Sequence, residues 1–321
     1  MLKTALVFHD NRRDTPVWRH FYDKMGAFYE KRGFRVLFER TVKESIEVVD
    51  KLQPDVVCMW NGHQEELSDV KDWIRKKERV QVIAENGFMP QCDKIILDNV
   101  GISGSALKND EQWDWTAGFK PQDFLRWKAE YINKWFESYS TGSYTTIGFS
   151  DTPPKPYIAV LGQLDNDNAM KYANGNSCKE LYDYVCSRFH PDIVWLRPHP
   201  KANIGDSLAI CPATRIIKTT RLHPLLYGSS LVVSYNSTAT FDALIHRANV
   251  AACGSGPWPH WLVQTFSMND NLLNYYYDGC PNDNQLWLAR DMWLDYVRRI
   301  QIDKEHPSFD HPRNERVLLG N

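Results

Sequence analysis

The chain has 321 residues and a formal net charge of −2 at pH 7. This length fits two α/β domains of roughly 100 to 200 residues each, and the near-neutral charge argues against a nucleic-acid partner. The seven cysteines are odd in number and lack CxxC spacing, which argues against a disulfide framework or a cysteine zinc site and indicates free thiols in a reducing compartment.

The first part of the chain alternates strand and helix patterns. We expect strands at 5–8, 34–38, 55–60 and 80–84, and helices at 17–32, 43–52 and 65–77. Such an alternation predicts a parallel sheet whose strand-end loops meet at one edge. Polar residues follow several of these strands and are candidate ligand contacts at that edge, namely His9, Asp10, Asn61 and His63.

The pattern loosens after the fourth strand, with a short strand at 95–98 and a helix at 124–139. Residues 140–155 are rich in Ser, Thr, Gly and Pro, which is typical of an interdomain linker. We therefore predict an N-terminal α/β domain over residues 1–150 and a C-terminal α/β domain over residues 151–321.

The second half repeats the alternation of strands and helices. We expect strands at 157–162, 193–196, 214–218, 231–234 and 248–253, helices at 176–189 and 239–246, and an amphipathic C-terminal helix at 285–300. This last helix is predicted to pack back across both domains. The fold class that follows is α/β, with one mostly parallel sheet in each domain.

No apolar run reaches the roughly 18 residues that a membrane span needs. The start of the chain is a short strand pattern without the length and flanks of a signal peptide. We therefore predict a cytoplasmic protein without a transmembrane segment. Peripheral association with the inner face of the membrane stays compatible with this prediction.

Acidic residues follow the first strand of the second half. That strand ends in Gln163-Leu164-Asp165-Asn166-Asp167, and the next one ends in Arg197-Pro198-His199-Pro200-Lys201. Both loops should face one crevice, because open α/β sheets bind ligands at the carboxyl ends of their strands. Asp165 or Asp167 can then act as nucleophile, base or metal ligand. The alternative is a solvated turn whose Asp side chains cap the following helix.

The second loop is basic and stiff. His199 lies between two prolines, which fix the backbone and remove hydrogen-bond donors. Together with Arg197 and Lys201, it suits a leaving phosphate that needs its charge neutralised and a proton supplied. The alternative is a structural histidine in a tight turn.

Hydroxyl groups stand at a third strand end. Ser234, Ser237 and Thr238 close the strand at 231–234 and open the next helix. Hydroxyls and unpaired backbone N–H groups at a helix N-terminus bind anions. Ordinary helix capping is the alternative interpretation, and both can hold at once.

Glu85 follows an apolar strand of the first half and precedes Asn86-Gly87. A carboxylic acid at a sheet edge beside a closing cleft is a candidate acid/base catalyst, because burial there raises its pKa. A solvated glutamate before a turn is the alternative interpretation. No Walker loop and no HExxH motif is present, and no GxGxxG motif follows a predicted strand.

The order of these motifs resembles the capsule-polysaccharide synthesis family, and in particular its retaining β-Kdo transferases. The resemblance covers residues 55 to 260 and rests on five segments: Glu85 to Phe88, Leu97 to Ile102, Gly162 to Asp167, Arg197 to Pro200, and Ser234 to Leu244. It implies two Rossmann-like domains facing a cleft, the GT-B arrangement. It also implies CMP-β-Kdo as the donor, a glycan acceptor, and no metal or other cofactor.

The resemblance also implies roles for single residues. Asp167 would be the nucleophile that takes the sugar, with Asp165 as second choice, and Glu85 would be the general acid/base for the acceptor hydroxyl. The donor contacts would be Gln163, Asp165, His199, Arg197, Lys201, Ser234, Ser237 and Thr238, on the C-terminal domain. From their place at the strand ends, and not from the resemblance, the candidate acceptor contacts are His9, Asp10, Asn61 and His63, on the N-terminal domain.

Two departures from the family pattern leave alternatives open. The family commonly has Glu-Asp-Asp where this chain has Asp165-Asn166-Asp167, and Asp-Gly where this chain has Asn86-Gly87. Another CMP-linked acidic sugar, such as a sialic acid, or another nucleotide sugar would fit the same scaffold. So would transfer of a polyol phosphate, and so would a non-catalytic module that binds a sugar nucleotide or a glycan.

Overall fold

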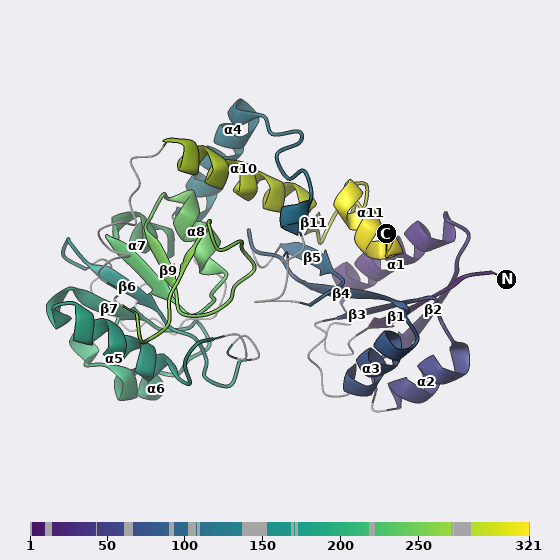
Figure 1. Cartoon of the computed structure of the whole chain (residues 1–321), viewed down its shortest axis with the longest axis horizontal. Coiled ribbons are helices and arrows are strands. Elements are labelled where there is room, and N and C mark those ends of the chain that lie inside the picture. Colours follow the sequence, from purple (N-terminus) through teal and green to yellow (C-terminus); the bar gives the residue numbers. More distant parts are fainter. Residues whose placement is uncertain are drawn as a thin grey trace. The chain divides into compact units, whose positions relative to one another are not determined.

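The computed structural model describes residues 2–9, 15–42, 44–60, 67–89, 93–101, 107, 110–136, 153–167, 170, 173–217, 222–270, 272 and 284–320. The chain forms two compact units. Unit 1 comprises Met1–Ile102 and Val297–Asn321, and unit 2 comprises Ser103–Tyr296. One sheet lies at the centre of each unit (Figure 1).

The sheet of unit 1 has six strands in the order β11-β5-β4-β3-β1-β2. Their bounds are β1 Thr4–His9, β2 Arg35–Arg40, β3 Val56–Trp60, β4 Val80–Asn86, β5 Lys94–Asp98 and β11 Ile302–Asp303. The first four strands are parallel, as predicted, and β5 runs antiparallel to both of its neighbours. The carboxyl ends of β1, β3 and β4 therefore lie side by side at one edge.

Helices cover both faces of this sheet (Figure 1). They are α1 Pro16–Glu30, α2 Ser45–Leu52, α3 Ser68–Lys76 and α11 Pro312–Leu319. The buried side chains of α3 are Val70, Trp73 and Ile74, the spacing that places them on one helix face against β1, β3 and β4. On the opposite face, Tyr29 of α1 donates a hydrogen bond to Leu318 O of α11 at 2.9 Å.

The C-terminal segment belongs to unit 1 because a buried ion pair holds it there. Arg313 of α11 lies 2.8 Å from Asp98 of β5, and the two side chains are 2% and 5% exposed. The other carboxylate oxygen of Asp98 accepts N–H bonds from Val100 and Gly101. Breaking such a pair leaves an unpaired buried charge, which costs about 3–5 kcal/mol.

The sheet of unit 2 has five strands, all parallel, in the order β10-β9-β8-β6-β7. Their bounds are β6 Ile158–Leu161, β7 Val194–Arg197, β8 Leu231–Ser234, β9 Val250–Ala252 and β10 Gln264–Thr265. The strand predicted at 214–218 is wrong: Ala213–Arg215 forms a 3-10 helix, and Ile216 makes only an isolated bridge to Leu196. Arg215 holds this turn by donating to Asp192 O at 2.6 Å.

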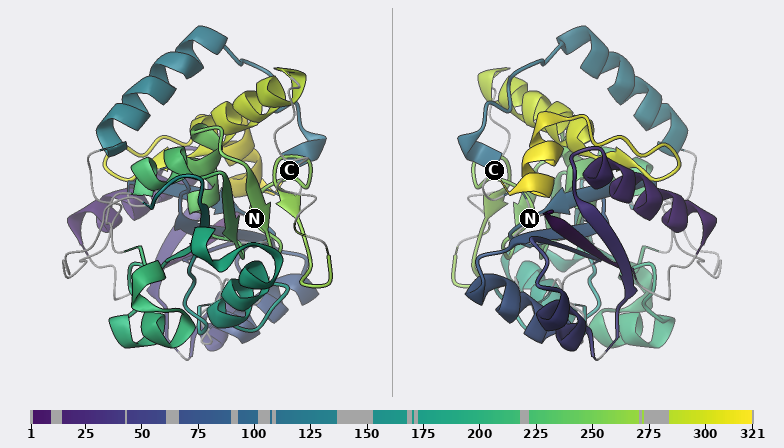
Figure 2. Two further views of the ribbon diagram at one scale, coloured as in Figure 1. Left: turned by 90° about the vertical axis from the view of Figure 1, so that its left-hand side faces the viewer. Right: turned by 90° about the vertical axis from the view of Figure 1, so that its right-hand side faces the viewer.

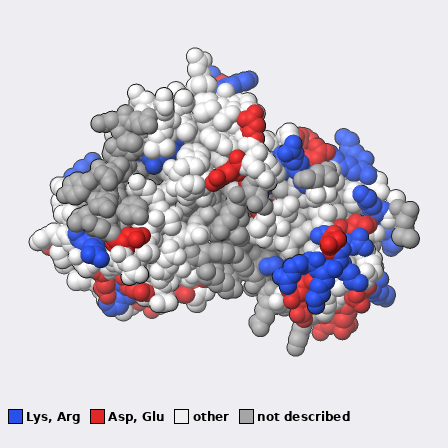
Figure 3. All heavy atoms as spheres, viewed as in Figure 1, with Lys and Arg blue, Asp and Glu red and all other residues white. Residues whose placement is uncertain are grey.

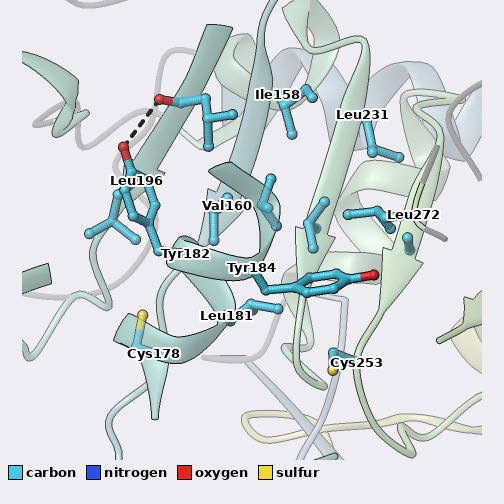
Figure 4. Packing of buried hydrophobic residues seen from close by; sticks show 14 of the residues in the cluster. Ile158, Val160, Cys178, Leu181, Tyr182, Tyr184, Leu196, Leu231, Cys253 and Leu272 are labelled. Carbon is cyan, nitrogen blue, oxygen red and sulfur yellow. Dashed lines mark hydrogen bonds between the residues drawn. The ribbon is translucent and has the colours of Figure 1, made fainter. Parts of the chain in front are cut away.

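The core of unit 2 lies between its sheet and helix α5, Cys178–Arg188. Leu181 and Tyr182 of α5 pack on Val160 and Leu196 of the adjacent strands β6 and β7 (Figure 4). The helix begins where the sequence predicts, because Ser177 caps it by accepting the N–H of Glu180 at 3.2 Å. The remaining short helices are α6 Ile204–Ile210, α7 Leu222–Gly228, α8 Ala239–Ile245, η4 Asp110–Gln112 and η6 Pro191–Ile193.

Two long helices, α4 Pro121–Phe136 and α10 Asn284–Ile300, lie next to each other (Figure 2). Lys128 of α4 is 3.7 Å from Asp291 of α10, and Tyr131 of α4 donates to Asp242 of α8 at 2.6 Å. These contacts attach α4 to unit 2. The units thus differ from the predicted division near residue 150, because residues 103–136 join unit 2 and residues 297–321 join unit 1.

Among the described residues, no helix has both the length and the apolar composition that crossing a membrane requires. On the face drawn in Figure 3, Lys and Arg side chains alternate with Asp and Glu side chains over the region of α2 and α3. Mixed signs at this density are typical of a solvated helix face.

Candidate functional site

Three strand ends lie side by side in unit 2, because β8, β6 and β7 are adjacent and parallel. The loop with Asp165 and Asp167 leaves β6, the loop with His199 leaves β7, and the loop with Ser237 leaves β8. The structure therefore brings the predicted donor-side loops to one sheet edge. This is the edge at which parallel α/β sheets bind ligands.

The first two loops touch at Gly162. Its N–H donates to Arg197 O at 2.8 Å. A Cβ atom at this position would lie 3.1 Å from both Arg197 O and His199 N. The loops can approach this closely because residue 162 has no side chain.

The two acidic residues of the first loop have different surroundings. Asp165 is exposed, and its Oδ1 accepts the N–H of Cys178, the first residue of α5, at 2.7 Å. Asp167 is half-buried, and its carboxylate acts on His199 by raising the pKa of the imidazole. Asp165 therefore anchors a helix, whereas the charge of Asp167 acts on His199 of the basic loop. Gln163, which lies in the same loop between β6 and Asp165, is half-buried.

His199 is set up as a neutral hydrogen-bond donor. Its Nδ1 accepts the N–H of Lys201 at 3.1 Å, so the neutral ring carries its proton on Nε2. Burial lowers the pKa of His199 below its usual 6.5; Asp167 opposes this effect, and Lys201 and Arg197 add to it. At neutral pH the ring can donate Nε2–H to an anionic oxygen without adding a full charge.

The two cations of the basic loop differ in burial. Lys201 is exposed. Arg197, the last residue of β7, is only 6% exposed, and its charge lowers the pKa of both Asp242 and His223. Burial is the larger cause of both shifts, and it raises the pKa of Asp242 to about 7 and lowers that of His223 to about 3. These two residues belong to a polar cluster inside unit 2, which sequence patterns did not indicate.

The hydroxyl residues at the end of β8 also divide into two groups. Ser234 is fully buried, and its Oγ lies 3.3 Å from Thr240 Oγ1, so it packs α8 on the sheet. Ser237 and Thr238 are half-buried ahead of α8, and Ser237 Oγ accepts the N–H of Ala239 at 3.3 Å. Ser237 and Thr238 thus stay candidates for an anion contact.

In unit 1, two predicted residues lie at the carboxyl edge of the sheet. Glu85, near the end of β4, is half-buried, and its Oε1 accepts the N–H of Asn86 at 2.7 Å. His9 ends β1 and is half-buried, with its ring 6.1 Å from the ring of Tyr22. Asp10, Asn61 and His63 lie outside the described residues.

The loop after Glu85 is held by the C-terminal segment. Gln301 Oε1 accepts the N–H groups of Phe88 at 2.5 Å and Met89 at 3.0 Å. Lys304 donates to Asn86 Oδ1 at 3.0 Å. A Cβ atom at Gly87 would lie 2.5 Å from Gln301 Oε1, so this close contact needs glycine. The partners are more than 200 residues apart in the chain, which is why local patterns gave no signal for them.

The fold was compared with known proteins. It is similar to the solved structure of "Thermosulfurimonas dismutans KpsC, beta Kdo 2,7 transferase", with a TM-score of 0.56, 16% identity, and 92% of this chain and 90% of that chain covered. It is also similar to the same organism's "KpsC, beta Kdo 2,4 transferase", with a TM-score of 0.57, 16% identity, and 87% and 90% covered. The chain has a GT-B-like fold. No family model and no curated protein matches the sequence.

The GT-B-like fold confirms the predicted fold class of two Rossmann-like α/β domains, and the resemblance to β-Kdo transferases is confirmed for the fold. The roles of single residues stay predictions. Among the described residues, no group of three or more His, Cys, Asp and Glu side chains is placed to hold a metal ion. That no metal or other cofactor is needed also stays a prediction.

Proposed function

We propose that this chain is a retaining glycosyltransferase that transfers Kdo from CMP-β-Kdo to a glycan or glycolipid acceptor in bacterial surface polysaccharide synthesis. The observation that carries the proposal is that the Asp167 loop and the basic His199 loop leave the adjacent parallel strands β6 and β7 at one sheet edge of a GT-B-like fold. The fold is shared with two proteins whose names state β-Kdo transfer.

In the first step, a carboxylate oxygen of Asp167 attacks the anomeric carbon of the donor. The bond between that carbon and the CMP phosphate oxygen breaks, and CMP leaves with the electron pair. His199 Nε2–H, Arg197 and Lys201 stabilise the charge that develops on the phosphate. The product of this step is a glycosyl ester of Asp167.

In the second step, an acceptor hydroxyl attacks the same carbon and the ester bond breaks, which returns the electron pair to Asp167. Glu85 takes the proton of the hydroxyl. Two displacements at one carbon give net retention of configuration. Gln163, Ser237 and Thr238 are the further donor contacts in this proposal, and His9 is the described acceptor contact.

The intact mass of the protein after brief incubation with fresh CMP-Kdo, without acceptor, tests the first step. We expect the wild type to gain one Kdo residue and Asp167→Asn to gain none. Glu85→Gln should form the adduct and keep it when acceptor is added, because the hydroxyl is no longer deprotonated. In the full reaction, both variants should lose several orders of magnitude in turnover.

Asp165→Asn decides between the two acids. An asparagine oxygen can still accept the N–H of Cys178, so the loop keeps its anchor. An adduct on Asp165→Asn but not on Asp167→Asn supports Asp167 as nucleophile, and the reverse result assigns the role to Asp165. Adduct formation only with another CMP-linked acidic sugar would change the donor. Binding of CMP-Kdo without adduct or CMP release would contradict catalysis and favour a binding module.

A further inference from the structure

Two arginine side chains lie against one tryptophan ring in unit 2. Trp287 belongs to α10, and its ring centroid is 5.5 Å from Cζ of Arg247 and 4.7 Å from Cζ of Arg290. Arg247 follows the C-terminal end of α8, so the contact joins this end to α10. Leu288, the next residue of α10, is 50% exposed. Guanidinium groups on an indole ring beside an exposed leucine form an amphipathic surface.

This surface continues onto α7. Tyr227, near the end of α7, is 67% exposed, and its ring centroid is 6.0 Å from that of His246, the residue before Arg247. Lys155 is exposed, and its Nζ lies 5.7 Å from the centroid of the Tyr227 ring. We call these side chains together the basic–aromatic face; it comprises Lys155, Tyr227, Arg247, Trp287, Leu288 and Arg290.

The face has an excess of positive charge. Asp291 of α10 lies 3.3 Å from Arg247 and 3.7 Å from Lys128 of α4, so one carboxylate faces two cations. The side chain of Asp291 is 9% exposed, whereas that of Arg247 is 54% exposed. Solvent therefore meets the cation more than the acid. Lys155 adds a further exposed cation beside Tyr227.

The backbone at Arg247 supports a function for its side chain. The residue has a φ of +56°, in the left-handed region. Glycine is the usual residue just after a helix in this conformation, because a Cβ atom makes it costly. The chain nevertheless places arginine here. A strained conformation of this kind persists where the side chain is needed, and here the side chain reaches Trp287 and Asp291 at the surface.

We propose that the basic–aromatic face binds the surface of a bilayer that contains anionic phospholipids. Lysine and arginine contact the headgroup phosphates, the aromatic rings lie at the interface, and the exposed leucine enters the apolar region. Charge alone would suit a soluble polyanion as well. The exposure of Leu288 and Tyr227 favours the bilayer, because a soluble polyanion offers no apolar region in which to bury them.

This inference goes beyond the proposed function and does not depend on it. The face includes none of the residues to which a role in sugar transfer was given, and its binding needs neither donor nor acceptor. For a glycolipid acceptor, the same binding would bring the enzyme to the surface that carries its substrate.

The test is cosedimentation of the full chain with lipid vesicles, without donor or acceptor. One set is pure phosphatidylcholine, and the other contains about one third phosphatidylglycerol. We expect the wild type to bind the anionic vesicles at least about tenfold more tightly than the neutral ones. Added salt should weaken this binding, because it screens charges near the surface.

Three variants test the face itself. Arg247→Gly removes a cation and gives the backbone its favoured residue, so the variant should fold and bind anionic vesicles about fivefold more weakly; Arg247→Lys should stay within about twofold of the wild type. Lys155→Gln should also weaken binding about fivefold. Leu288→Gln should weaken it about threefold to tenfold, because an apolar contact is lost.

Matched controls come from elsewhere in unit 2. The Cζ of Arg188 lies 5.2 Å from the ring centroid of Tyr184, which is a similar cation–ring contact. Leu208 of α6 is 49% exposed, almost as much as Leu288. Arg188→Gln and Leu208→Gln should leave vesicle binding unchanged, because neither residue belongs to the basic–aromatic face.

Each contrary outcome has a definite meaning. Equal binding to the two sets of vesicles would overturn the inference, and so would control variants that lose as much binding as the face variants. Binding that Lys155→Gln weakens but Leu288→Gln leaves unchanged would assign the face to a soluble polyanion and overturn the bilayer as its partner. The covalent-adduct test of the proposed function uses no vesicles, so the failure of one proposal is distinguishable from the failure of the other.

Discussion

A single glycine decides how closely the loops that follow β6 and β7 approach each other. The N–H of Gly162 bonds to Arg197 O, and the backbone of the basic loop fills the space that a Cβ would need. The contact joins the loop of Asp167 to the loop of His199. Their geometry is therefore set by backbone packing as well as by side chains.

Gly162→Ala tests this dependence. The new methyl group meets backbone atoms at 3.1–3.2 Å, so the basic loop must move by a few tenths of an ångström. We expect turnover of CMP-Kdo to fall about tenfold, because small displacements of catalytic groups are costly. Gly205→Ala is the matched control, since a Cβ there meets only the side chain of Asn203. Equal turnover in both variants would show that the loops tolerate the displacement.

At this scale the sequence predicted which residue types follow each strand. It did not predict which of them make structural contacts and which are candidate ligand contacts. Asp165 and Asp167 look equivalent in the sequence. They differ because Asp165 accepts a hydrogen bond from the backbone N–H of Cys178, which lies thirteen residues further along the chain. Asp242 appeared only as part of a motif, and its partners Tyr131 and His223 lie on other helices. Contacts of this kind depend on the tertiary fold and leave no local pattern.

Among the elements, the long and strongly periodic ones were predicted best. The parallel strands other than β10 and the helices α1, α5 and α10 were expected close to their observed bounds. The two-residue strands β10 and β11 and the short helix α11 were not expected. β10 pairs with β9, and β11 pairs with β5. Helix α11 is held by the ion pair of Arg313 with Asp98. The partners of β11 and α11 are distant in the sequence. Short segments carry too few residues for periodicity to be detected.

The loop of Glu85 shows how such a distant segment holds a candidate site residue. Gln301 follows α10 directly, and its amide oxygen accepts two consecutive N–H groups of the loop, while its Nε2 donates to Met89 O at 3.5 Å. Gln301 as a whole residue is 9% exposed, so water cannot readily replace these bonds. The segment after α10 therefore fixes the backbone of the loop that directly follows Glu85.

Gln301→Ala should separate the two steps of the proposed reaction. We expect the covalent adduct to form at the wild-type rate, while transfer to the acceptor slows about tenfold to a hundredfold because Glu85 loses its fixed position. Mass spectrometry before and after addition of acceptor measures both steps. Gln81→Ala is the control on the same strand, where the side chain makes one exposed bond to Asn99 O. Similar transfer rates in the two variants would contradict the positioning role of Gln301.

For the molecule as a whole, three buried or half-buried histidines make stability sensitive to acid. Burial lowers the pKa of His223 to about 3 and the pKa values of His246 and His311 to about 4, against 6.5 for an ordinary histidine. Below pH 6.5 the unfolded chain therefore binds more protons than the folded chain, and the free energy of unfolding falls as the pH falls. Asp242 acts in the opposite direction, because its raised pKa lets the folded state keep a proton up to about pH 7. The three histidines outweigh it, so acid destabilises the protein.

The substitution His311→Asn measures how much His311 contributes to the loss of stability in acid. His311 caps α11 by accepting the N–H of Arg313 on Nδ1 at 3.2 Å, which requires the unprotonated nitrogen. Asparagine is also a good cap and does not titrate, so the variant should match the wild type near pH 7 in urea unfolding. Near pH 5 the variant should be the more stable by about 1 kcal/mol, a value reduced for the partial exposure of His311 to solvent. A variant that loses as much stability as the wild type between these two pH values would mean that the neutral state of His311 contributes nothing to the acid response.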